Sequence, residues 1–381
     1  MAEIHGTCSD RFSGVRDVLS QYLDSGADIG ASAAVFVEGE PVVDIWGGFA
    51  DPDFTKPWER DTITHVFSLT KTMTAISALV LIDRGELDPD APVARYWPEF
   101  AQNGKEDVLV RHVLGHTSGV AGWSEPLSVE DLCDVEKSTA MLARQAPWSK
   151  PGTALGYHAF STGHMVNALT SRITGRTLGQ FFAEEICAPL GPDADFHIGT
   201  GPECDDRISP LIMGNPAADP SEHNDFARMA LFNPLITPVI SRTVPWRRAE
   251  IGGANGHGNA RAAALIQSVV ANGGEVGGVR LLSEKTCALA VQEQGSGMDL
   301  IMDAPLSWGM GYCTGSPLLE QLFGPRIVGH RIAFWGGGGG SMVVADLDTR
   351  MTVAYVMNRW LAGSFDARSC GIVQAAYEAI G

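Results

Sequence analysis

Positive charge is scarce in this 381-residue sequence, which has 27 lysines and arginines against 45 aspartates and glutamates and a formal net charge of −18. Such a charge repels the phosphates of nucleic acids and the anionic surface of a membrane. No apolar run reaches the roughly 18 residues that a membrane-spanning helix needs. We therefore expect no nucleic acid and no membrane as partner, and a small-molecule role fits the composition better.

Paired cysteines are missing as well. The 7 cysteines are an odd number, spread from Cys8 to Cys370 without a Cys-x-x-Cys pair, which is typical of reduced thiols. The first residues lack a basic segment followed by an apolar one, so we expect no secretory signal. These features together predict a cytoplasmic protein.

The order of predicted elements indicates the fold class. Helical periodicity marks residues 11–22, 68–87 and about 365–380, whereas β-rich runs occupy 31–51 and 331–358. With 45% hydrophobic residues the chain can bury a large core. We predict an α+β fold, in which an antiparallel sheet takes strands from both ends of the chain, is flanked by the terminal helices and carries a mostly helical lobe.

A serine and a lysine stand one helical turn apart in the stretch "THVFSLTKTMTA". If the helix begins at Ser68, the amine of Lys71 lies within hydrogen-bonding reach of the Ser68 hydroxyl. Burial and the positive end of the helix dipole both favour a neutral amine, which can accept the serine proton. Taken alone, the motif is more often a capping serine followed by a surface lysine.

A second polar cluster contains Tyr157, which opens another helical pattern. A tyrosine at a helix start can present its hydroxyl to a cleft and, beside a lysine, carry protons as a phenolate; the alternative is a packed aromatic side chain. The neighbouring His158 can reach the same cleft or serve the structure alone. His112 and His116 have a zinc-like spacing, but no glutamate follows His112, so we expect no metal.

Glycine is abundant near the end of the chain, in "AFWGGGGGSMVVAD". The run Gly336 to Gly340 lets the backbone approach a ligand closely, and a strand edge there can donate N–H groups to an oxyanion. The alternative is a flexible turn between two strands. A dinucleotide-binding loop is disfavoured, because the residues that follow have strand rather than helix character.

These motifs in this order resemble the serine β-lactamase and penicillin-binding-protein superfamily, whose nucleophile motif is Ser-x-x-Lys. The segments "VLGHTSGV", "PGTALGYHA", "ICAPLG" and "GANGHGNARA" are similar to its class C branch. Within that branch the sequence is most similar to the class VIII carboxylesterases, over nearly the whole chain. The resemblance implies a β-lactamase/transpeptidase-like fold.

The implied organisation is a single domain, residues 1–381, with its catalytic serine in a cleft between two lobes. We expect an α/β lobe from about residues 1–66 and 250–381, and a mostly helical lobe from about 67–249.

The resemblance also implies roles for particular residues. Ser68 would be the nucleophile, Lys71 its base partner and Tyr157 a second proton carrier. The backbone N–H groups of Ser68 and Gly338 would form the oxyanion hole. The expected substrate-binding residues are Trp335, Gly336, Gly337 and His158.

Two departures from the lactamase pattern bear on the substrate. The lactamase Tyr-x-Asn becomes Tyr157-His158-Ala159, and Trp335 replaces a lysine that would attract a β-lactam carboxylate. Both changes make the pocket less polar, which suits neutral esters with a short acyl chain. The resemblance therefore predicts a serine carboxylesterase with a small-molecule ester substrate and no metal or organic cofactor.

Two alternatives remain open. The first is another enzyme of the same scaffold: a β-lactamase, a D-amino-acid peptidase, an amide hydrolase or an acyltransferase. The second is a non-catalytic binding relative, against which the intact Ser68, Lys71 and Tyr157 speak. Nothing in the sequence indicates an oligomeric state.

Overall fold

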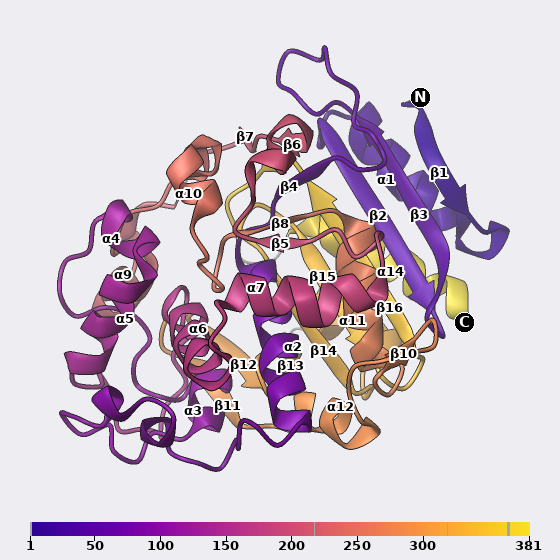
Figure 1. Ribbon diagram of the computed structural model, residues 1–381. Helices are drawn as coiled ribbons and strands as arrows, with labels where there is room; N and C mark the ends of the chain where they lie inside the picture. Colours follow the sequence, from indigo (N-terminus) through magenta and orange to yellow (C-terminus); the bar gives the residue numbers. More distant parts are fainter. Residues whose placement is uncertain (1, 217, 318, 364–365) are drawn as a thin grey trace.

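A computed structural model describes residues 2–216, 218–317, 319–363 and 366–381 of the chain (Figure 1). Its centre is a nine-stranded sheet with the order β1-β3-β2-β16-β15-β14-β13-β12-β11, antiparallel at every pairing. The strands are β1 (Ile4–Cys8), β2 (Gly30–Val37), β3 (Glu40–Gly48), β11 (Gly295–Asp299), β12 (Ala304–Trp308), β13 (Cys313–Gly315), β14 (Ile332–Gly336), β15 (Met342–Asp346) and β16 (Met351–Met357).

Helices cover both faces of this sheet (Figure 1). α1 (Ser13–Asp24) and α14 (Ala367–Ile380) pack together on one face, and α11 (Ala260–Ala271) packs on the other, against β2, β15 and β16. The central strands are accordingly apolar and buried on both faces. The predicted α+β fold, an antiparallel sheet flanked by terminal helices, is confirmed, although the start expected near Phe365 lies outside the described residues.

The strands of the sheet come from the two ends of the chain, so that β2 pairs with β16. The intervening chain consists of helices, loops and a few short strands. The helices there are α2 (Thr70–Asp83), α3 (Val110–Leu114), α4 (Val129–Cys133), α5 (Val135–Arg144), α6 (Ser161–Thr174), α7 (Leu178–Phe182), α8 (Ala188–Leu190), α9 (Asp225–Leu231) and α10 (Val244–Arg248). The division into two lobes at the boundaries given above stays a prediction.

α2 is the helix around which the site is built. Each residue from Thr70 to Leu81 is buried, because α2 packs against α6 and α7 on one side and against α11, α12 (Glu284–Ala290) and β14 on the other. Its threonines and serine avoid unpaired hydroxyls by donating to nearby carbonyls, as Ser77 does to Met73. None of the helices described by the structure has both the length and the apolar character needed to cross a bilayer.

A smaller sheet of four short strands leads into α2. Its order is β5 (His197–Ile198), β8 (Gly256–Gly258), β4 (Ile63–His65) and β6 (Ile208–Ser209). The remaining short elements are the hairpin β9 (Glu275–Val276) and β10 (Val279–Arg280), the parallel pair β7 (Ile212–Met213) and β17 (Arg359–Trp360), and the helix α13 (Leu319–Phe323).

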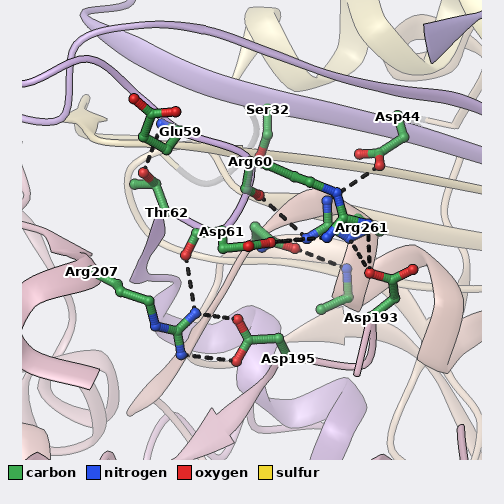
Figure 2. A network of polar contacts seen from close by, with 12 residues as sticks. Ser32, Asp44, Glu59, Arg60, Asp61, Thr62, Asp193, Asp195, Arg207 and Arg261 are labelled. Atoms are coloured by element: carbon green, nitrogen blue, oxygen red, sulfur yellow. Dashed lines mark hydrogen bonds and ion pairs between the residues drawn. The ribbon is translucent and has the colours of Figure 1, made fainter. Parts of the chain in front are cut away.

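A buried arginine fastens the small sheet to the large one (Figure 2). Arg261 of α11 has a side chain that is 4% exposed, and its guanidinium forms ion pairs with Asp44 at 3.2 Å, Asp61 at 2.8 Å and Asp193 at 3.2 Å. Asp44 belongs to β3, whereas Asp61 lies just before β4. Because a buried charge is tolerated only when it is paired, these contacts fix α11 against both sheets.

Candidate active site

Ser68 lies in a single 3-10 turn, Phe67–Leu69, between β4 and α2. The residue before it, Phe67, has a φ of +44°, a conformation that residues with side chains rarely adopt. Two hydrogen bonds of Val66 hold the chain in this form: its N–H donates to the Gly256 carbonyl at 2.9 Å, and its carbonyl accepts from the Ser341 hydroxyl at 3.0 Å. The turn therefore places Ser68 at the mouth of α2, which begins two residues later than predicted.

The amine of Lys71 is buried directly beneath this serine. Its residue is 2% exposed, and Nζ lies 3.2 Å from the Ser68 Oγ, 2.6 Å from the Ala159 carbonyl oxygen and 2.7 Å from the Gly253 carbonyl oxygen. Burial, which penalises the charged form, holds the pKa of Lys71 well below that of a solvated lysine. The contacts give the amine two carbonyl acceptors and one hydroxyl.

Tyr157 completes a triangle with these two residues. Its hydroxyl is hydrogen-bonded to Ser68 and accepts from the Trp335 Nε1 at 3.0 Å, and its ring centroid lies 4.6 Å from the Lys71 Nζ. Burial is the main reason why the pKa of Tyr157 is raised; the charge of Asp299 adds to it, and the hydrogen bonds that Tyr157 forms with Ser68 and Trp335 oppose it. Tyr157 is therefore a neutral phenol.

Tyr157 does not open a helix, which corrects the sequence-based expectation. α6 begins at Ser161, and the segment before it has no regular structure. Two side chains accept hydrogen bonds from backbone N–H groups there. The N–H of Tyr157 donates to the Asp299 Oδ1 at 3.1 Å, and the N–H of His158 donates to the His116 Nδ1 at 3.0 Å. These bonds hold the segment extended and aim the phenol at Ser68.

The glycine run connects β14 to β15 beside the turn that contains Ser68. A Cβ atom on Gly337 would lie 1.9 Å from the Val66 carbonyl oxygen, so only glycine fits this close approach. The Gly337 N–H donates to Ser341, and its carbonyl accepts from the Gly340 N–H at 3.1 Å. Among the described residues, the N–H groups of Ser68 and Gly338 have no backbone acceptor, so both are available to a ligand.

A pocket of about 360 Å³ opens over Ser68. Its lining is almost entirely aromatic, aliphatic or glycine, and no lysine, arginine, aspartate or glutamate belongs to the part described by the structure. The lining residues are Phe67, Ser68, Tyr157, Phe160, Ala218, His223, Leu231, Phe232, Leu235, Ile236, Pro238, Met302, Trp335, Gly336, Gly337, Gly338, Trp360, Ala362 and Gly363. The structure thus brings together Ser68, Tyr157, Trp335 and the glycines named from the sequence.

His158 is the exception: contrary to the expectation from the sequence, it does not line this pocket. It is fully buried behind Tyr157, with Nε2 2.6 Å from the Ser118 Oγ and Nδ1 2.5 Å from the Gly156 carbonyl oxygen. Burial lowers the pKa of His158 to about 4, so the ring is neutral. Because successive side chains of an extended segment point to opposite sides, Tyr157 faces the pocket and His158 faces the core.

Sequence reasoning missed one wall of the pocket. Residues 218–238 contribute His223, Leu231, Phe232, Leu235 and Ile236, from a segment whose pattern predicts no element clearly. The apolar pairs in "LFNPLI" could have indicated this wall, because clustered apolar residues in a polar loop usually pack against another apolar surface. Asp299, which fixes the Tyr157 backbone, had no recognisable motif around it.

Residues 15–376 match the family model described as Beta-lactamase, and the chain belongs to this family. The protein is 33% identical to the Esterase/beta-lactamase LipL of Mycobacterium tuberculosis (strain ATCC 25618 / H37Rv), over 94% of this chain and 84% of the relative. A crystal structure of a family VIII carboxylesterase, 38% identical, superimposes with a TM-score of 0.92 over 99% of this chain and 100% of the other.

A penicillin-binding protein homologue from Caulobacter crescentus is similar too. It is 36% identical, with a TM-score of 0.91 over 99% of this chain and 100% of the other. The resemblance to class VIII carboxylesterases, first seen in short motifs, is therefore confirmed along the chain.

Proposed function

We propose that this protein is a serine carboxylesterase that cleaves esters through an acyl-enzyme on Ser68. The observation that carries the proposal is the environment of Lys71, a buried amine with two carbonyl acceptors and one hydroxyl neighbour. A neutral amine has two N–H bonds and one lone pair. The carbonyls of Ala159 and Gly253 accept the two N–H bonds, which leaves the lone pair directed at the Ser68 hydroxyl.

One direction of hydrogen bonding then satisfies the whole triangle. The Trp335 N–H donates to the Tyr157 oxygen, the Tyr157 O–H donates to the Ser68 oxygen, and the Ser68 O–H donates to the Lys71 lone pair. In this arrangement Lys71 is the base that takes the serine proton. Tyr157 starts as a donor rather than as a phenolate, because its pKa is raised.

Acylation follows from this order. The Ser68 oxygen attacks the ester carbonyl carbon as its proton passes to Lys71, and the negative charge on the carbonyl oxygen is held by the N–H groups of Ser68 and Gly338. When the carbon–oxygen bond to the alcohol breaks, the proton on Lys71 returns to the leaving oxygen, directly or through the Tyr157 hydroxyl. Water then attacks the acyl-enzyme and gives a proton to Lys71. Lys71 returns this proton to the Ser68 oxygen as the bond between that oxygen and the acyl carbon breaks, and the acid is released.

The pocket favours neutral esters with a short acyl chain. At about 360 Å³ it lies toward the lower end of the range of small-molecule sites, and its walls are apolar. A β-lactam or a peptidoglycan peptide would bring a carboxylate, for which the described walls offer no lysine or arginine. We also propose a cytoplasmic location, which the 7 free cysteines support.

The test uses p-nitrophenyl butyrate in a rapid-mixing experiment with wild type, Ser68→Ala and Ser77→Ala. Ser77 is the matched control, because it is buried in the same helix and bonds only the Met73 carbonyl. We expect a burst of p-nitrophenol and a butyryl adduct on Ser68 in wild type and Ser77→Ala, and neither in Ser68→Ala. A burst that survives in Ser68→Ala would contradict the proposal.

β-Lactam hydrolysis is a second candidate activity, since the relative LipL is named both esterase and beta-lactamase. Comparing kcat/KM for p-nitrophenyl butyrate with that for nitrocefin separates the two. We expect the ester to be preferred by orders of magnitude, whereas a preference for nitrocefin would make this protein a lactamase.

A further inference from the structure

A buried arginine lies behind the glycine run, on the side away from the pocket. Arg368 is in the first turn of α14, its side chain is 5% exposed, and its Nη2 donates to the Gly339 carbonyl at 2.7 Å. Two carboxylates hold the guanidinium in place, Asp28 at 2.6 Å and Asp366 at 2.6 Å. The Gly339 carbonyl therefore accepts a hydrogen bond from a guanidinium whose position is fixed.

The rest of the guanidinium is equally committed. Its Nε donates to Asp366 at 2.9 Å, and Nη1 also contacts the carbonyl oxygens of Arg359 at 2.9 Å and Ala27 at 3.2 Å. A guanidinium has five N–H bonds in a rigid planar fork, so contacts in this number fix its orientation. Arg368 thus ties α14 and the loop before β2 to the glycine run.

The glycine run needs such an anchor. Gly339 and Gly340 have φ values of +100° and +123°, and glycine has no side chain that would restrict them to these values. The Leu361 N–H also approaches the Gly339 carbonyl, but at 3.4 Å it is a much weaker constraint than the arginine. The charge-assisted bond from Arg368 is therefore the main contact that fixes this peptide group.

Two peptide groups connect Arg368 to the proposed oxyanion hole. Arg368 binds the carbonyl of the peptide between Gly339 and Gly340, and the N–H of that same peptide donates to the Gly337 carbonyl at 3.1 Å. The Gly337 carbonyl belongs to the peptide whose N–H is that of Gly338. Because hydrogen bonds in a chain polarise one another, the positive charge of Arg368 strengthens the Gly338 N–H as a donor.

We propose that Arg368 is a positioning residue for ester hydrolysis, which aims and polarises the Gly338 N–H through these two peptide groups. The inference rests on the proposed function, in which Gly338 holds the oxyanion. Since the oxyanion exists only in the transition state and the tetrahedral intermediate, loss of Arg368 lowers kcat and leaves substrate binding almost unchanged.

The test compares Arg368→Lys with Arg261→Lys. Arg261 is the matched control, because it is 4% exposed and paired with carboxylates but has no contact with the glycine run. For Arg368→Lys we expect kcat for p-nitrophenyl butyrate to fall at least tenfold with KM within twofold. The Ki of a trifluoromethyl ketone, which forms an oxyanion on the serine, should rise in proportion. Arg261→Lys should lose stability and keep kcat within twofold.

A kcat within twofold of wild type in folded Arg368→Lys would overturn the inference, and so would an equal loss of kcat in Arg261→Lys. If Arg368→Lys does not fold, Asp366→Asn decides, since asparagine still caps α14 but removes one charge that holds the guanidinium. It should lower kcat at least threefold at unchanged KM; unchanged kcat would refute the role of Arg368. Failure of the proposed function is recognised separately, by a burst that persists in Ser68→Ala.

Discussion

Replacing Lys71 by methionine tests the neutral amine on which the proposed chemistry depends. Methionine has a similar volume and no charge, so it fits the buried site. It leaves the carbonyls of Ala159 and Gly253 without their donor, which costs about 1–3 kcal/mol for each buried group at every pH. The informative part of the difference in the free energy of unfolding between wild type and Lys71→Met is the part that depends on pH.

The sign and size of that part follow from proton linkage. Burial holds the pKa of Lys71 well below the value of about 10.4 that lysine has in the unfolded chain. Between these two pKa values the unfolded chain binds one proton more than the folded chain, so the free energy of unfolding of wild type rises by about 1.4 kcal/mol per pH unit relative to Lys71→Met. For an amine that is neutral from pH 7 upward, the gain between pH 7 and pH 9 is about 2.7 kcal/mol.

Urea unfolding of wild type and Lys71→Met at half-unit steps from pH 6.5 to 9.5 measures this difference. Subtracting the two curves cancels the titrating groups that Lys71 does not influence. Lys150→Met is the control, because the exposed amine of Lys150 stays in water in both states and its difference from wild type should be flat. A difference for Lys71→Met that is also flat would show that Lys71 keeps its charge in the folded protein, and the proposed base would be lost.

Three further substitutions probe the parts around the base. Trp335→Phe removes the donor 3.0 Å from the Tyr157 hydroxyl. We expect acylation by p-nitrophenyl butyrate, measured by stopped flow, to slow five- to tenfold, which corresponds to the loss of about one hydrogen bond. An unchanged acylation rate would contradict that role. Gly337→Ala places a Cβ 1.9 Å from a carbonyl oxygen, so kcat should fall at least a hundredfold as the oxyanion loop shifts. His158→Gln should lower the free energy of unfolding by about 1–3 kcal/mol, measured in urea, while kcat of the folded variant stays within threefold; a selective loss of kcat would return His158 to the site.

Local patterns were sufficient for the fold class and for the proximity of Ser68 and Lys71. The apolar runs of β2, β15 and β16 predict strands, and the helical spacing after Ser68 places Lys71 on its face, because these features depend on residues close in sequence. The resemblance connected Tyr157 and the glycine run, which the sequence had shown as separate motifs, to Ser68. It also added His158, which does not line the pocket, since the orientation of such a segment depends on which partners accept its N–H groups.

The remaining parts of the site depend on contacts between distant segments. Arg368 meets Gly339 across the end of α14, and Asp299 meets Tyr157 from the edge of the large sheet. Neither pair has a spacing rule, because each is set by how whole elements pack. The pocket wall in residues 218–238 is similar. Its apolar side chains can be recognised as pocket lining only when the position of the pocket is known, and the sequence does not give that position.

The uncharged base and the uncharged pocket depend on each other. In the proposed mechanism Lys71 is neutral because it is buried with no carboxylate partner among the described residues, so any anion brought into the pocket would favour its protonated form. A substrate carboxylate about 8 Å from the amine, at an effective dielectric constant of about 20, favours protonation by about 2 kcal/mol. Such a substrate would inhibit the base that should activate Ser68. The kcat/KM for p-nitrophenyl hemiglutarate should therefore fall furthest below that for p-nitrophenyl pentanoate at low pH. Selectivity for neutral esters is thus the expected consequence of the proposed mechanism, in which a lysine without a carboxylate partner is the base.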